Sequence, residues 1–350
     1  MLQHILVPLD GSSYAASAIP IAARHARATG GSVTLLQSVP YPLETEESFT
    51  EPQVSVKGAP EADHARVVDY LTRMAASDGL SGVSTDIDVT DCSPVQAILS
   101  CAQSHQADII VMRSSGAKGM ERWISGSVAR EVGRHSPVPV LVSRTGDGMV
   151  NLSPGGIRPV VFLVALDGSS QAEAALAPAA HLSAALSAPA PGVLHLVQVL
   201  HFPTMEAGGH HEQGIAARKW AEAEARVYLR SIERRLREGD FASLHLSITS
   251  SVVASTDVVH TLTGCAESCT CKEGVEELNG CHVIAMATHG RSRLQHLLAG
   301  SVTERVFDAS RHPLLIVRSS QLQETHEKTG GTVSEQRSSD IKSAETGLHF

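Results

Sequence analysis

Short apolar runs along the chain alternate with longer segments in which apolar residues recur every three or four positions. Within the first 145 residues, the apolar runs predict strands at residues 3–9, 33–39, 83–89, 109–112 and 138–143. The helical spacing predicts helices at residues 13–29, 60–78, 94–106 and 127–134. Strands that alternate with helices are typical of a mostly parallel sheet with helices on both faces. The pattern therefore predicts an α/β fold of the doubly wound class, with a ligand crevice at the carboxyl ends of the strands.

Local signals mark the ends of the predicted helices. Ser13 is a candidate N-cap for the first helix, and Gly30-Gly31 is expected to stop it, because glycine adopts the left-handed conformation that ends many helices. Pro94 suits the first turn of the helix at residues 94–106, where its missing N–H has no partner to lose.

The whole pattern occurs twice. The segment HILVPLDGSS at residues 4–13 recurs as VFLVALDGSS at residues 161–170, and VPVLV at residues 138–142 matches HPLLIV at residues 312–317. We infer a duplicated domain, each copy being a doubly wound, five-stranded parallel sheet. The predicted organisation is a first domain at residues 1–145, a linker at 146–158, a second domain at 159–319 and a disordered polar tail at 320–350.

Each copy carries a loop of small residues between a buried strand and the start of a helix. In the second copy, Ala287-Thr288-His289-Gly290 is followed after nine residues by Gly300-Ser301. In the first copy, Gly116 is followed after nine residues by Gly126-Ser127. A helix N-terminus presents unpaired N–H groups that bind anions, and glycine lets a phosphate approach the backbone. The loops therefore indicate two candidate phosphate sites.

The strand followed by Asp-Gly-Ser, together with Gly-x9-Gly-Ser before the last helix and strand, resembles the universal stress protein family. The resemblance covers residues 1–145 and 159–318, and MATHGRS at residues 286–292 and LAGSVTERV at residues 298–306 carry it most specifically. It implies a tandem member with two such domains. In ATP-binding members, the loop Gly-x2-Gly-x9-Gly-(Ser/Thr) holds the phosphates and ribose, while the first-strand Asp and an apolar residue after the second strand hold adenine. The implied ligand is ATP or a related adenine nucleotide, with Mg²⁺ as an accompanying ion.

Carried across by position, the implied nucleotide-binding residues form one set in each half. The set in the second half is Asp167, Val199, Met286, Ala287, Gly290, Gly300, Ser301 and Val302. The set in the first half is Asp10, Val39, Met112, Gly116, Gly126, Ser127 and Val128. Both halves depart from the family's first glycine, which is Ala287 in one and Arg113 in the other. Alanine is a small change, whereas Arg113 either adds bulk where the ligand approaches or offers its charge to a phosphate. The second half is therefore the preferred site.

Each feature also has a purely structural interpretation. Asp-Gly after a strand is a common turn signal, and glycines serve a tight strand-to-helix turn with or without a phosphate. Ser127 and Ser301 are equally suited to capping their helices. Arg291, Arg293 and Lys118 either pair with phosphates or are solvated surface cations. The sequence alone leaves these alternatives open.

Composition narrows the class of partner. The net charge of -9 and the aromatic content of 3% argue against nucleic acid, whose binding needs a basic face or stacking platforms. No apolar run approaches the roughly 20 residues that span a bilayer, and the N-terminus lacks a signal-peptide pattern. A cytoplasmic location with reduced thiols is expected. Cys265, Cys269 and Cys271 lack the Cys-x2-Cys spacing of structural zinc sites, so no metal site is expected. Trp123 and Trp220 are expected to pack rather than to bind.

Three functions are compatible with this sequence. The first is a stress-response protein that binds an adenine nucleotide and is not an enzyme, since neither a nucleophile–base pair nor a P-loop stands out. The second is an interaction module that has lost nucleotide binding in one or both halves. The third is a hydrolase or transferase that acts on adenine nucleotides.

The last strands, which follow Pro139 and Pro313, are expected at sheet edges, where apolar strands invite pairing. The resemblance implies that they pair within one chain as a pseudo-dimer, and whether two chains also form a homodimer stays open.

Overall fold

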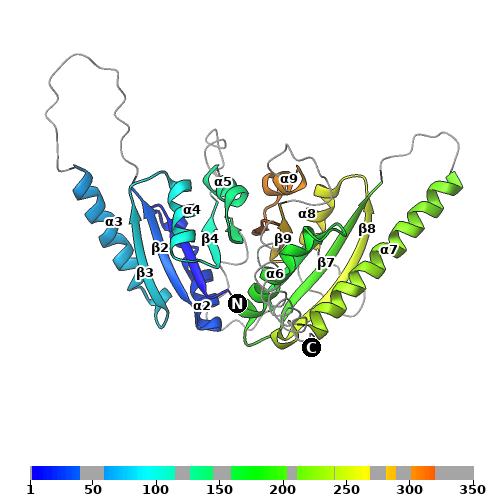
Figure 1. The fold of residues 1–350 in the computed structure, drawn as a ribbon, viewed down its shortest axis with the longest axis horizontal. Coiled ribbons are helices and arrows are strands. Elements are labelled where there is room, and N and C mark those ends of the chain that lie inside the picture. Colours follow the sequence, from blue (N-terminus) through cyan, green and yellow to red (C-terminus); the bar gives the residue numbers. More distant parts are fainter. Residues whose placement is uncertain are drawn as a thin grey trace, which may run out of the picture.

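Ten strands form one sheet in the computed structural model, which describes residues 2–39, 59–114, 127–144, 159–202, 211–239, 241–268, 281–288 and 301–319 (Figure 1). The strands of the first half are β1 (His4–Leu9), β2 (Ser32–Ser38), β3 (Ser84–Thr90), β4 (Ile109–Arg113) and β5 (Val140–Ser143). Those of the second half are β6 (Val161–Leu166), β7 (Gly192–His201), β8 (Leu246–Ser255), β9 (Val283–Ala287) and β10 (Leu314–Val317). The order across the sheet is β3-β2-β1-β4-β5-β10-β9-β6-β7-β8.

Helices cover both faces of this sheet. Those of the first half are α1 (Ser13–Ala16), α2 (Ile19–Thr29), α3 (Ala59–Ala75), α4 (Pro94–Ser104) and α5 (Ser127–His135). Those of the second half are α6 (Leu176–Ser187), α7 (His211–Glu238), α8 (Val258–Ser268) and α9 (Ser301–Ala309). Helices α2, α3, α6 and α7 bury their apolar residues in one core cluster, and α4, α5, α8 and α9 bury theirs in a second cluster. The two core layers follow from the alternation of side chains along each strand.

The two halves share the sheet through their last strands. Within each half the five strands pair in parallel, as predicted, with the order 3-2-1-4-5 in terms of that half's own strands. At the join, β5 and β10 pair antiparallel, with Leu141 opposite Leu315. The prediction that these edge strands pair within the chain is confirmed. The five-stranded parallel sheet expected in each half is also confirmed, and this pairing joins the two into one continuous sheet.

Two pairs of helices pack across the join. On one face α2 contacts α6, and on the other face α5 lies beside α9 (Figure 1). Arg130 and Arg134 of α5 form ion pairs with Asp308 and Glu304 of α9, respectively. Phe307 of α9 is buried beneath the guanidinium groups of Arg130 and of Arg144, which lie 5.6 and 4.7 Å from its ring centre. The join therefore combines strand pairing, apolar burial and paired charges.

The predicted helix at residues 13–29 is wrong in one respect, because it is two helices. Ser12, not Ser13, is the N-cap of α1, and its Oγ accepts a hydrogen bond from the Ala15 N–H at 3.0 Å. The break falls before Pro20, whose ring has no N–H to donate and suits the first turn of a new helix. Gly30 ends α2 in the left-handed conformation, as predicted.

One surface residue differs from what the sequence predicted. Trp220 on α7 is 70% exposed, so the expectation that it packs is wrong. Trp123, the linker at 146–158 and the tail at 320–350 lie outside the described residues.

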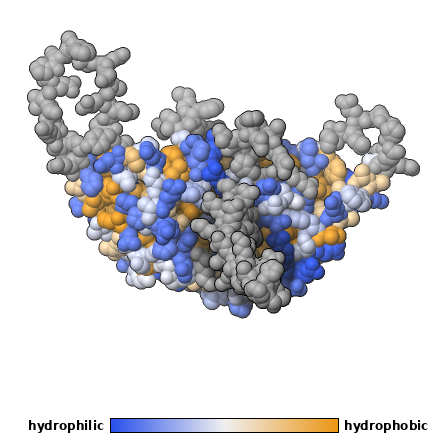
Figure 2. All heavy atoms as spheres, viewed as in Figure 1, coloured by the Kyte–Doolittle hydropathy of each residue, from blue (hydrophilic) through white to orange (hydrophobic). Residues whose placement is uncertain are grey.

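Figure 2 shows hydrophilic and hydrophobic residues interspersed over the described part of the face in view. Among the helices of the described residues, none combines the length and the apolar character needed to cross a membrane.

Candidate functional site

The turn after the first strand of each half has the same hydrogen-bonded structure. Asp10 Oδ1 accepts hydrogen bonds from the backbone N–H and the hydroxyl of Ser12, at 2.9 and 2.5 Å. Asp167 Oδ1 accepts the same pair from Ser169, at 2.9 and 2.5 Å. The glycine between them has a φ of 82° in both halves, which glycine adopts without strain. The recurring Asp-Gly-Ser thus builds a turn, and it leaves each carboxylate at the carboxyl end of its strand.

Apolar residues of the second-half set converge on one face of the sheet beside this turn. Asp167 directly follows β6, which lies between β7 and β9. Val199 of β7, Met286 of β9 and Val302 of α9 all pack into the core cluster beneath α8 and α9. Met286 is buried, and Val199 and Val302 are half-buried. Three elements therefore bring apolar side chains together near the carboxyl ends of β7 and β9 and the start of α9.

The first-half set is brought together less completely. Met112 of β4 and Val128 of α5 pack into the same core cluster as their second-half counterparts. The register places Gln37 opposite Leu9 and Gln198 opposite Leu166, so Ser38 is the counterpart of Val199. The family resemblance implied Val39 as the counterpart of Val199. Val39 instead lies one residue further along, where its N–H donates to the carbonyl of Thr90 at 2.8 Å.

In the first half, the side chains of Tyr14 and Arg113 bridge the carboxyl ends of β1 and β4. Tyr14 follows the first-strand turn, and its hydroxyl donates to the carbonyl of Ser114 at 2.6 Å. The Arg113 guanidinium stacks on the Tyr14 ring, 4.8 Å from its centre, and donates to the carbonyl of Arg144 at 2.6 Å. The point between β1 and β4 is where the strand order of this half reverses, and ligands of doubly wound sheets bind at such points. The bridge therefore occupies the expected ligand position of the first half.

The second half has different residues at the bridging positions. Gln171 follows Asp167 by four residues, as Tyr14 follows Asp10, and Ala287 follows Met286 as Arg113 follows Met112. Ala287 has no side chain that reaches across the crevice. Instead, its carbonyl accepts a hydrogen bond from the Thr303 hydroxyl at 2.9 Å, which ties the first turn of α9 to the end of β9. The helix N-terminus is thereby fixed beside the strand that carries Met286.

Each half also has a tyrosine near its first-strand aspartate and a buried glutamine at the end of its second strand. The sequence analysis missed both residue types. The side-chain carbonyl oxygens of Gln37 and Gln198 are buried and have no hydrogen-bond partner among the described residues. Burial and the Asp10 carboxylate raise the pKa of Tyr70. Burial and the carboxylates of Glu173 and Asp167 raise the pKa of Tyr228, whose hydroxyl donates to Glu173 at 3.2 Å. A glutamine recurs one residue before Ser38 and one residue before Val199. This repeat is the sequence signal that could have identified the buried glutamines.

Several predicted residues lie outside the described part of the chain. These are Gly116, Gly126, Gly290 and Gly300, the cations Lys118, Arg291 and Arg293, and the cysteines Cys269 and Cys271. Ser127 and Ser301 begin α5 and α9, respectively, and Ser127 is exposed. Cys265 is half-buried on α8. The phosphate-binding role of the glycine loops therefore stays a prediction.

Comparison with known proteins agrees with this geometry. A model of the universal stress protein family matches residues 1–144 and 161–318. A universal stress protein of Staphylococcus aureus strain USA300 is 27% identical over 154 residues, which cover 43% of this chain and 90% of that protein. The crystal structure of a universal stress protein from Archaeoglobus fulgidus superposes with a TM-score of 0.59 at 18% identity, covering 91% of this chain and 97% of the other.

A second crystal structure, of a universal stress protein from Pseudomonas aeruginosa UCBPP-PA14, covers 93% of this chain and 97% of its own, with a TM-score of 0.55 at 17% identity. The two solved structures extend over nearly the whole chain and thus share its tandem fold. The family match covers both halves of the sequence, each around its own Asp-Gly-Ser turn. The chain therefore belongs to the universal stress protein family, with two domains of that family in tandem.

Proposed function

We propose that this chain is a stress-response protein that binds an adenine nucleotide in its second half, and that it acts by binding rather than as an enzyme. The observation that carries the proposal is the contrast between the two crevices. The first is bridged by Tyr14 and Arg113, whereas the second has Gln171 and Ala287 at those positions. We infer from this contrast that the second half binds the ligand and that the first half does not.

The second crevice offers chemistry that suits the parts of a nucleotide. Val199, Met286 and Val302 supply apolar surface for a purine ring. The Asp167 carboxylate supplies a hydrogen-bond acceptor for an amine or a ribose hydroxyl. The N-terminus of α9 supplies backbone N–H groups for a phosphate. Glu304 in the first turn of α9 is paired with Arg134, which offsets its repulsion of an anion.

Calorimetric titration of the full chain with ATP, ADP and AMP, each with and without Mg²⁺, tests the proposal. We expect one nucleotide per chain. The variant Gln171→Tyr/Ala287→Arg introduces the first-half bridge into the second half, and it is expected to abolish binding. Arg113→Ala is the matched control in the first half, and it is expected to leave the affinity unchanged.

A second matched pair separates ligand contact from turn structure. Asp10→Ala and Asp167→Ala remove the same two hydrogen bonds from equivalent turns. Both variants should therefore lose similar stability, but only Asp167→Ala should weaken nucleotide binding, by about tenfold or more. Equal effects of the two variants on binding, or no binding by the wild-type chain, would refute the proposal. Sustained phosphate release from ATP would instead favour the alternative function of a hydrolase that acts on adenine nucleotides.

The first half fits the second function that the sequence allows, an interaction module without nucleotide binding. Its bridged crevice and its ion pairs to α9 make it a partner for the second half. We propose that the first domain supports the second through the shared sheet and binds no nucleotide itself.

A further inference from the structure

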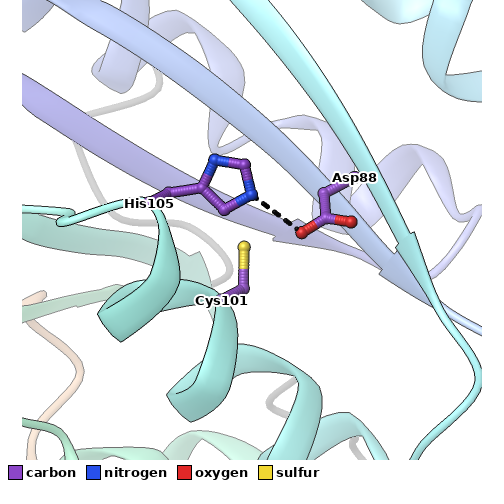
Figure 3. A group of neighbouring side chains, drawn as sticks. All are labelled: Asp88, Cys101 and His105. Atoms are coloured by element: carbon purple, nitrogen blue, oxygen red, sulfur yellow. Dashed lines mark hydrogen bonds and ion pairs between the residues drawn. The ribbon is translucent and has the colours of Figure 1, made fainter.

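A cluster of three metal-binding side chain types lies in the first half, away from both crevices. Asp88 is on the edge strand β3, Cys101 is on α4, and His105 directly follows that helix. Figure 3 shows the imidazole and the thiol approaching the carboxylate from the end of the helix. His105 Nε2 lies 3.0 Å from Asp88 Oδ2, and one ligand atom from each residue lies within 4.8 Å of the other two.

The spacing of the residues places them on one side of the helix. Cys101 and His105 are four residues apart, so their side chains lie one turn apart on the same face. Asp88 faces them because its strand presents alternate residues toward α4. The cluster is therefore built by the fold and does not depend on a flexible loop.

The contacts within the cluster suit a cation at its centre. Asp88 Oδ2 forms a hydrogen bond with His105 Nε2 at 3.0 Å, and the Cys101 sulfur lies within 4.8 Å of one ligand atom of each. A divalent cation at the centre would bond to the Cys101 sulfur as a thiolate, and the thiol proton would pass to solvent. Thiolate and carboxylate together would then balance its two positive charges.

We propose that Asp88, Cys101 and His105 bind one Zn²⁺ ion in the first half, with water as the fourth ligand. Thiolate, imidazole and carboxylate are the ligands of zinc sites, and three protein ligands leave one position for solvent. Zinc bonds of about 2.0–2.3 Å place tetrahedral ligands roughly 3.3–3.8 Å apart, so the cluster must contract by about 1 Å. His105 is able to make this movement, because its side chain is 39% exposed and follows the helix end.

Solvent reaches the cluster from the amino ends of the strands. A surface cavity of about 480 Å³ is lined by His105, by Asp86 and by the amino-terminal residues of β1, β2 and β3. Asp88 is itself 25% exposed, whereas Cys101 is buried at the inner side of the cluster. An ion would therefore enter past His105 and Asp88 and meet the thiolate last.

The second half provides an internal comparison. Cys265 is the eighth residue of α8, as Cys101 is the eighth residue of α4. Asp88 lies opposite Leu36, and the equivalent pair in the second half is Ser251 and Val197. Ser251 is a hydroxyl that hydrogen-bonds to the His195 ring at 2.9 Å. The second half therefore keeps the cysteine but lacks the carboxylate, so the same site is not expected there.

Metal titration of the full chain, first stripped of metal with a chelator, tests the proposal. Zinc affinity is measured by competition with a chromophoric chelator, and Co²⁺ serves as the spectroscopic probe. We expect one ion per chain and a near-ultraviolet thiolate-to-cobalt charge-transfer band. Cys101→Ser should abolish the band, while Cys265→Ser, the matched control, should retain it.

Two conservative variants keep the test valid if Cys101→Ser disturbs the core. Asp88→Asn and His105→Gln alter partly exposed side chains, and each should lower zinc affinity by at least about tenfold. Zinc should also raise the thermal midpoint of the wild-type chain and of Cys265→Ser but not of Asp88→Asn. The proposal is overturned if the wild-type chain gives no charge-transfer band. It is equally overturned if Asp88→Asn and His105→Gln bind zinc with wild-type affinity, because the ion would then lie elsewhere.

Discussion

Replacing Arg134 by glutamate reverses a charge that lies across the join between the two halves. Arg134 of α5 pairs with Glu304 of α9, and Arg130 pairs with Asp308 in the same way. Both cations belong to the first half and both anions to the second. Arg134→Glu would therefore place two carboxylates against each other at the join.

The exposure of the pair sets the size of the effect. The side chains of Arg134 and Glu304 are each 33% exposed, so solvent screens their attraction. Exposed ion pairs contribute about 0.2–1 kcal/mol, and this pair should lie near the upper end because it is partly covered. Loss of the attraction and gain of a similar repulsion together predict a destabilisation of about 1–2 kcal/mol. The double variant Arg134→Glu/Glu304→Arg should recover most of it, although Glu131, 4.0 Å from Arg134, would then face a like charge.

Urea unfolding of the full chain, followed by circular dichroism, measures this effect as a double-mutant cycle. The loss should shrink in about 1 M salt, where the Debye length is only about 3 Å. Arg66→Glu is the matched control, because Arg66 forms an exposed ion pair within α3, far from the join, and its reversal should change stability by no more than about 0.5 kcal/mol. A coupling energy near zero between Arg134 and Glu304, or equal losses for Arg134→Glu and Arg66→Glu, would refute the reasoning.

Two glycines and three histidines give further predictions. Gly192→Ala should destabilise the chain by about 2 kcal/mol, because the new Cβ would lie 2.6 Å from Ser183 Oγ and 2.7 Å from its backbone carbon. Gly264→Ala, with no atom within 4 Å of the new Cβ, should stabilise α8 by about 0.5–1 kcal/mol, and thermal melts that rank the two variants otherwise would contradict this. Burial lowers the pKa values of His25, His181 and His195, so the unfolded chain binds more protons below about pH 6.5. The free energy of unfolding should therefore fall from about pH 7 to about pH 5.5, by at most about 1.4 kcal/mol per pH unit for each histidine, and His195→Gln should flatten that slope in urea titrations.

The elements of each half could be predicted because their signals are local. Apolar runs located the five strands, and Gly30 and Pro94 marked helix ends that the structure retains. The break between α1 and α2 was missed, although Pro20 was the signal for it. An apolar run alone does not show whether an edge strand has a partner, so the pairing of the two last strands was predicted only through the family resemblance.

The site could be predicted only where the motif repeats. The Asp-Gly-Ser turn was located in both halves because it recurs at the same place on the first strand. The bridge between Tyr14 and Arg113 was missed, since it joins residues that are 99 positions apart by sequence number. Asp88, Cys101 and His105 were missed for the same reason, because the fold alone brings the strand residue to the helix.

The charges at the join also determine how two chains would associate. A first half is complementary to a second half, whereas two first halves would oppose Arg130 to Arg134 and two second halves would oppose Glu304 to Asp308. Two copies of this chain that met through this surface would therefore exchange halves reciprocally, the first half of each pairing with the second half of the other. Such an exchanged dimer would contain the same contacts as the monomer, twice over. The balance between the two forms would then follow protein concentration rather than any new interface.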